Sequence, residues 1–75
     1  MKYVVKWHPK ERPEHVVTCD GDYPNPSQAM DFACAVLANH PIDVWVESVS
    51  RGDKIADAAR IREHCRTRGL YPQSN

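Results

Sequence analysis

The chain has no long apolar run, few glycines and no excess charge of either sign. Its 75 residues include 3 glycines, and 10 Lys and Arg side chains balance 10 Asp and Glu side chains. Because a membrane-spanning helix needs about 20 consecutive apolar residues, no segment is expected to cross a bilayer. The scattered glycines form no Gly-rich phosphate loop. The N-terminal residues lack the apolar core of a signal peptide, so we expect a cytoplasmic protein.

The chain also lacks the spacings that build metal sites and catalytic centres. Zinc ligands usually come in pairs such as Cys-x-x-Cys or His-x-x-x-His, and the sequence contains neither. The most accessible thiol, Cys19, would lie about 13 Å from His15 along a straight strand, too far for a catalytic base. Asp20 and Asp22 flank Gly21, and turn formation accounts for both. We therefore expect no metal, no cofactor, no catalytic residue and no enzymatic activity.

The cysteines are odd in number and far apart in the sequence. They are Cys19, Cys34 and Cys65, so they cannot all pair within one chain. A reducing cytosol would keep them as thiols. We expect Cys34 and Cys65 to act as small buried apolar side chains.

Alternating apolar residues and dense turn residues predict an α+β fold. Strands are expected at 2–8 and 14–19, joined as an antiparallel hairpin, and at 42–49. A helix at 26–38 follows from apolar residues at helical spacing after Asn25, a favourable N-cap. The expected architecture is a meander-like antiparallel sheet of three or four strands. The elements follow the order strand, strand, helix, strand, optional strand, helix, with both helices packed on one face.

The segment after the turn at 51–53 allows two interpretations. In the first, a helix follows the turn directly. In the second, residues 54–56 add a fourth strand, Asp57 caps the helix, and the helix covers 58–68. In both interpretations the helix ends at Gly69, because glycine suits the left-handed position after a helix.

The length of the chain is enough for one domain, which we expect over residues 1–69, with a frayed tail at 70–75. A chain of this size buries only about 60% of its extended surface, so a partner often stabilises such a domain. A homodimer is expected for this reason. The predicted core is Val5, Trp7, Val17, Ala29, Phe32, Ala33, Val36, Leu37, Val44, Val46, Ile61 and Cys65.

The balanced net charge hides a separation along the chain. Residues 1–50 carry 4 basic and 7 acidic side chains, a net −3, whereas residues 51–75 carry 6 basic and 3 acidic ones, a net +3. The basic end suggests contacts with an anion or a nucleic acid. On a helical wheel its arginines fall in two rows instead of one basic face, which weakens that signal. The candidate contact residues are Arg60, Arg62, Arg66 and Arg68.

Trp45 lies between Asp43 and Glu47 on the wetter face of the strand at 42–49. A tryptophan in this place is either covered by a helix or an anchor at an interface. The acidic strand face and the basic helix could also meet across a dimer. We therefore expect an interaction surface formed by Trp45, Asp43 and Glu47.

These observations favour a small non-catalytic interaction module that self-associates, with a second copy or another protein as partner and no membrane contact. Weak binding of single-stranded RNA or DNA through the basic helix is the alternative function. A small enzyme is the second alternative. The predicted order of elements occurs in many small bacterial domains, but no motif is specific enough to identify a family.

Overall fold

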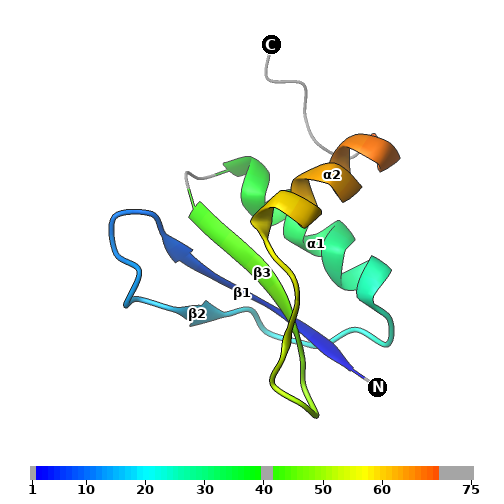
Figure 1. The fold of residues 1–75 in the computed structure, drawn as a ribbon, viewed down its shortest axis with the longest axis horizontal. Helices are drawn as coiled ribbons and strands as arrows, with labels where there is room; N and C mark the ends of the chain where they lie inside the picture. The colour runs from blue at the N-terminus through cyan, green and yellow to red at the C-terminus, as the bar shows by residue number, and fades with distance from the viewer. Residues whose placement is uncertain (1, 40–41, 70–75) are drawn as a thin grey trace.

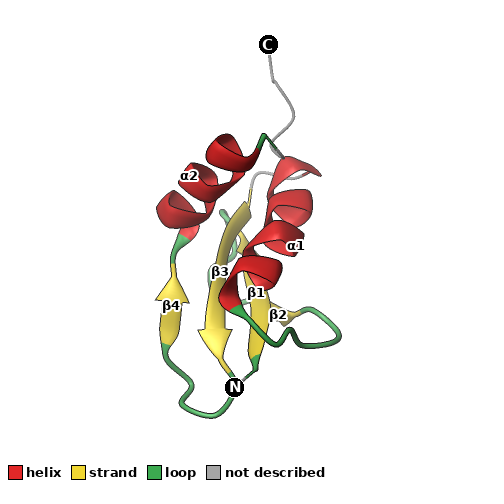
Figure 2. Ribbon diagram, turned by 90° about the vertical axis from the view of Figure 1, so that its right-hand side faces the viewer, coloured by secondary structure: helices red, strands yellow, loops and turns green. Residues whose placement is uncertain are grey.

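The computed structural model describes residues 2–39 and 42–69, and it shows an α+β fold (Figure 1). Within these residues, both helices lie on the same side of one antiparallel sheet (Figure 2). The predicted fold class is confirmed, and the fourth strand resolves the alternatives for residues 54–56. The elements are β1 (Tyr3–Pro9), β2 (Val17–Thr18), α1 (Pro26–Asn39), β3 (Ile42–Ser48), β4 (Lys54–Ala56) and α2 (Ala58–Arg68). The tail expected at 70–75 lies outside the described residues.

The strands do not form a meander. Their order in the sheet is β2-β1-β3-β4, so β1 pairs with both β2 and β3. The β1–β3 ladder is the longest, running from Tyr3↔Ser48 to Pro9↔Ile42. The expected meander was wrong because α1 connects β2 to β3 and carries the chain across to the far side of β1. Strand β2 is also shorter than the expected span 14–19.

Both helices begin where the sequence predicts; α2 also ends there, and α1 extends one residue beyond the predicted end, to Asn39. The Asn25 side-chain oxygen accepts a hydrogen bond from the Gln28 backbone N–H at 2.9 Å, and Asp57 accepts one from Arg60 N–H at 2.9 Å. Each cap satisfies a backbone donor that the first helical turn cannot pair. Helix α2 ends at Gly69, whose φ of 68° is the left-handed conformation that glycine adopts readily.

The core lies between the sheet and the two helices. Its buried residues are Val5, Ala29, Met30, Ala33, Cys34, Leu37, Val44, Val46, Ala56, Ile61 and Cys65. Of the residues predicted for it, Trp7, Val17 and Val36 are half-buried. Phe32 is 36% exposed, so its placement in the core was wrong. The buried stripe of α1 is centred near Ala33, and Phe32 falls on its flank, where its ring lies 5.8 Å from that of Tyr23.

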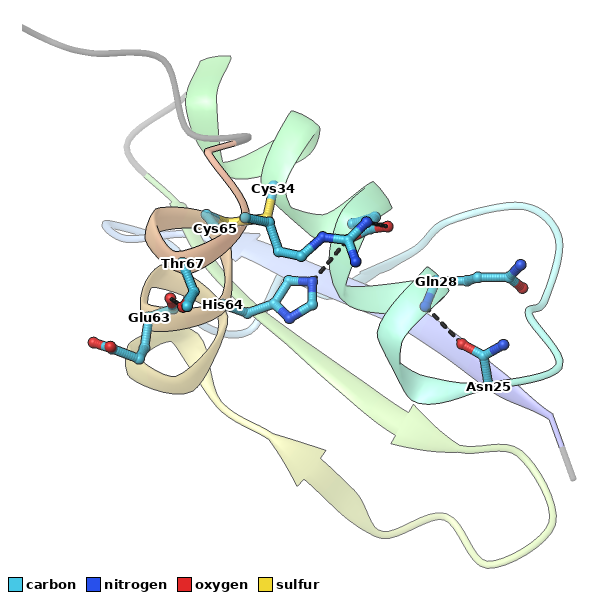
Figure 3. Close-up of polar contacts among 9 residues, drawn as sticks. Asn25, Gln28, Cys34, Glu63, His64, Cys65 and Thr67 are labelled. Atoms are coloured by element: carbon cyan, nitrogen blue, oxygen red, sulfur yellow. Dashed lines mark hydrogen bonds and ion pairs between the residues drawn. A yellow bond between two sulfur atoms is a disulfide. The ribbon is translucent and has the colours of Figure 1, made fainter.

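Cys34 and Cys65 form a disulfide that joins α1 to α2, with a Cα–Cα distance of 5.8 Å (Figure 3). Both side chains are buried, as predicted, but the expectation of free thiols was wrong. The two residues are 31 positions apart, and they meet because both lie on helix faces turned to the same core. Cys19 is the free cysteine.

The disulfide matters because α2 has little else to bury. Its mean hydropathy is strongly negative, and its buried residues are Ile61 and Cys65. A crosslink between distant residues reduces the conformational freedom of the unfolded chain and so favours the folded state. The disulfide is therefore a main support of the α1–α2 contact.

Reduction of Cys34–Cys65 is expected to lower the free energy of unfolding by about 4 kcal/mol, the entropic effect of opening a loop between residues 31 positions apart. Urea denaturation followed by circular dichroism, with and without dithiothreitol, measures the change. The variant Cys19→Ser is the control and should show the same difference. Equal unfolding midpoints for the oxidised and reduced protein would contradict this role of the disulfide.

Candidate functional site

The sheet face turned away from both helices carries the predicted interface residues. Strand alternation directs Val5, Val44 and Val46 to the helices, so the residues between them point to the opposite side. The β1–β3 register places Val4 beside Glu47, Lys6 beside Trp45, and His8 beside Asp43. Thr18 pairs with Lys6, and Lys54 pairs with Glu47, on the flanking strands. We call this surface the open face; its residues are Val4, Lys6, His8, Thr18, Asp43, Trp45, Glu47 and Lys54.

Trp45 lies near the middle of the open face and is held by its neighbours. Its Nε1–H donates a hydrogen bond to Glu47 Oε2 at 2.8 Å. The Lys54 ammonium lies 5.0 Å from the ring centroid, and the His8 ring centroid is 5.7 Å away. Trp45 is therefore half-buried by side chains of its own sheet and not by a helix. These contacts within one chain hold the indole ring in place without a binding partner.

The charges of the open face are paired within it. Lys6 Nζ lies 3.1 Å from Glu47 Oε1, and His8 Nε2 lies 3.6 Å from Asp43 Oδ2. His8 Nδ1–H donates to the Pro9 carbonyl oxygen at 2.8 Å, so Nε2 is the nitrogen that gains a proton. Lys6 and Lys54 balance the two carboxylates, so the acidic strand face expected from the sequence is a neutral surface.

Glu47 is the open-face carboxylate whose ionised form is stabilised by its neighbours. Burial raises the pKa of Glu47, but hydrogen bonds from Trp45 and Lys6, with the positive charges of Lys6 and Lys54, outweigh it and hold the pKa below its ordinary value. A lowered carboxyl pKa means that the ionised form stabilises the fold above the ordinary pKa. That contribution is lost as the pH falls through the lowered value.

The indole N–H resonance of Trp45 should therefore report the ionisation of Glu47. The change in its NMR chemical shift is expected to have its midpoint below about pH 4.3, the ordinary Glu pKa. The variant Glu47→Gln should abolish this transition, and the indole N–H of Trp7 serves as the internal control. A midpoint at or above the ordinary value would contradict the arrangement.

The structure separates the four candidate arginines. Arg66 forms an ion pair with Glu63 on the same helix, and Arg68 lies 3.2 Å from Asp31 Oδ2 on α1. Arg60 and Arg62 form no ion pair with any residue that the structure describes. Half of the expected basic contact set therefore takes part in contacts within the chain.

Asp31 and His64 form a pair that the sequence analysis missed. His64 Nε2 lies 2.7 Å from Asp31 Oδ1, although the two residues are 33 positions apart. The other Asp31 oxygen accepts from Arg68, so one carboxylate links α1 to α2 through two side chains. One signal was available: Asp31 lies one helical turn before Cys34, and His64 precedes Cys65. Pairing the two cysteines would have brought Asp31 and His64 together.

A hollow of about 280 Å³ lies beside this pair, lined by Met30, Arg60, Glu63, His64 and Thr67. A concave surface with a titratable pair in hydrogen-bond reach is a feature that catalysis needs. The thiols do not add a nucleophile here. Cys34 and Cys65 are joined, and burial, together with Asp20, raises the pKa of the Cys19 thiol against a smaller opposing effect of Trp7.

Comparisons with protein-family models, curated proteins and solved structures found no match for this chain. Within residues 2–39 and 42–69, no three His, Cys, Asp or Glu side chains converge on a place where a metal could bind. Among the same residues, neither helix combines the length and the apolar character that a membrane span requires. The function has to be argued from the open face and the hollow themselves.

Proposed function

We propose that the protein is a non-catalytic interaction module that self-associates through the open face. The observation that supports this most is Trp45 near the middle of a sheet face that neither helix covers. Tryptophan is enriched among the residues that dominate binding energy at interfaces. The ring is already fixed by Glu47, Lys54 and His8, so binding would cost little side-chain entropy.

The proposed partner is a second copy, because the open face is complementary to itself. A two-fold axis parallel to the strands, between β1 and β3, places β1 of one copy over β3 of the other at the same height. The register then brings Lys6 over Trp45 of the second copy, and His8 over Asp43. A lysine over an indole ring and a histidine facing a carboxylate are both favourable contacts. The same register brings Val4 over Glu47 of the second copy. Only the methylene groups of the Glu47 side chain then add apolar contact area.

The neutrality of the open face supports the same proposal. An interface that buries unpaired charges loses hydration energy, and charges that already have partners lose less. Lys6–Glu47 is such a pair within one chain.

Two observations weigh against the alternative of nucleic-acid binding. The open face carries no excess of positive charge, and polyanion binding depends on one. Tyr3 and Trp7 share the helix-facing side of β1 with Val5, so they are not available to stack bases on the open face. Nucleic-acid binding would therefore have to use the basic helix. Salt-dependent fluorescence anisotropy with labelled RNA and DNA tests it.

A cytoplasmic location is part of the same proposal, but one reason for expecting it no longer applies. It was expected partly because three thiols suit a reducing compartment, and two of them form a disulfide. Buried disulfides persist mainly in oxidising compartments. Alkylation of free thiols in native cells lysed directly into denaturant, which exposes the two buried side chains, followed by mass spectrometry, distinguishes the two cases. Alkylated Cys34 and Cys65 support the cytoplasm, and a protected pair supports an oxidising compartment.

Sedimentation velocity at micromolar concentration should show a dimer, which the variant Trp45→Ala converts to a monomer because it removes the central contact. Phe32→Ala is the matched control, since it removes an exposed aromatic ring on α1, outside the open face. A wild-type monomer, or a Trp45→Ala variant that still dimerises, would contradict the proposal.

Charge reversal tests the pairing without removing the indole. Lys6→Glu places like charges beside Glu47 in both copies and should weaken the dimer by about tenfold or more. Adding Glu47→Lys restores opposite charges within each copy but leaves a carboxylate over the indole of the other copy, so it should not recover the affinity. Circular dichroism confirms that each variant is folded. Full recovery of the affinity in the double variant would exclude this arrangement.

A further inference from the structure

The hollow between α1 and α2 has an unpaired cation at its rim. The backbone N–H of Arg60 is bound to the Asp57 cap, but its guanidinium forms no ion pair with any described residue. A guanidinium presents several N–H donors in a fixed plane and suits the oxygens of a phosphate-type anion. Arg60 and His64 are four residues apart, so both point from the same side of α2 into the hollow.

His64 is held in place for a second contact. Its Nε2–H donates to Asp31 Oδ1 at 2.7 Å, which fixes the ring between the helices (Figure 3). Nδ1 is then the ring nitrogen left for a second contact, and it is a donor in the imidazolium form. Arg60 and His64 would together offer donors in different planes, the arrangement that a tetrahedral oxyanion accepts.

The acidic groups near the hollow are already engaged. Both Asp31 oxygens accept hydrogen bonds, one from His64 and one from Arg68. Glu63 lines the hollow as well, and it forms an ion pair with Arg66. The charged groups around His64 are therefore Asp31 from α1 and Arg60, Glu63 and Arg68 from α2. Asp31 and Glu63 each have a cationic side chain beside them, which reduces their repulsion of an anion.

We propose that Arg60 and His64 bind a small tetrahedral oxyanion, such as phosphate or the phosphate group of a small metabolite, in this hollow. A volume of about 280 Å³ lies at the small end of ligand sites, enough for one such group and a short attached part. Met30 contributes an apolar wall. The site is on the helix layer, so it does not depend on the self-association proposed for the open face.

Titration of the ¹⁵N-labelled protein with inorganic phosphate at constant ionic strength tests the proposal. Saturable NMR shifts are expected at the amides of α2 around Arg60 and His64. Arg60→Ala should weaken binding by about tenfold, the effect of losing one charge-assisted contact. Arg62→Ala is the matched control, because Arg62 is also exposed and without an ion pair but does not line the hollow. Its affinity should stay within about twofold of the unchanged protein.

The variant His64→Gln gives an independent readout. It removes the second proposed donor and should weaken the binding of sulfate, a tetrahedral oxyanion like phosphate, by about tenfold. Non-saturable shifts, equal losses in the Arg60 and Arg62 variants, or an unchanged sulfate affinity of the His64→Gln variant would overturn the proposal. Arg60→Ala leaves the Asp31–His64 link intact, so loss of folding cannot account for its result.

Discussion

The pairing of β1 with β3 is the constraint on which the rest of the structure depends. It runs through every residue of β1 and decides which side chains face the helices. Val5, Val44 and Val46 are buried on one side, and Lys6, Trp45 and Glu47 meet on the other. A shift of one residue would send the valines outward and the charged residues into the core, so burial fixes the register strongly. The open face is a direct consequence of how the core is built.

The separation of charge along the chain has an explanation within the fold. Arg68 and His64, from the basic end, share the carboxylate of Asp31 on α1. Lys54, also from that end, lies over Trp45 and helps to lower the pKa of Glu47. Arg68 and Lys54 therefore join elements that are distant in sequence. Among the described residues, the open face is neutral, and Arg62 and the Arg60 side chain at the hollow form no ion pair.

Local rules predicted the parts of the fold that depend on neighbouring residues. Asn25, Asp57 and Gly69 define helix ends through contacts within one turn, and the sequence was sufficient to place them. The faces of the strands were also predicted, because alternation is local. Trp45 was recognised as an interface candidate for the same reason, although its contacts with His8 and Lys54 come from other strands.

The features that were missed depend on how elements pack. The Cys34–Cys65 disulfide needs the relative placement of two helices, and the expected reducing compartment argued for free thiols. Asp31 and His64 meet only because of that packing. Phe32 has the apolar character of a core residue, but the angular position of the buried stripe on α1 decided its exposure. The sheet order likewise required knowing where α1 crosses.

The two proposed sites lie on separate layers of the molecule, with the open face on the sheet and the hollow between the helices. The central claim is that the β1–β3 register makes the open face complementary to a second copy. Isotope-filtered NOE spectroscopy on an equal mixture of labelled and unlabelled protein tests it most directly. We expect NOEs between the Lys6 methylene protons of one copy and the Trp45 ring of the other. No intermolecular NOE, or NOEs confined to α1 and α2, would contradict the account.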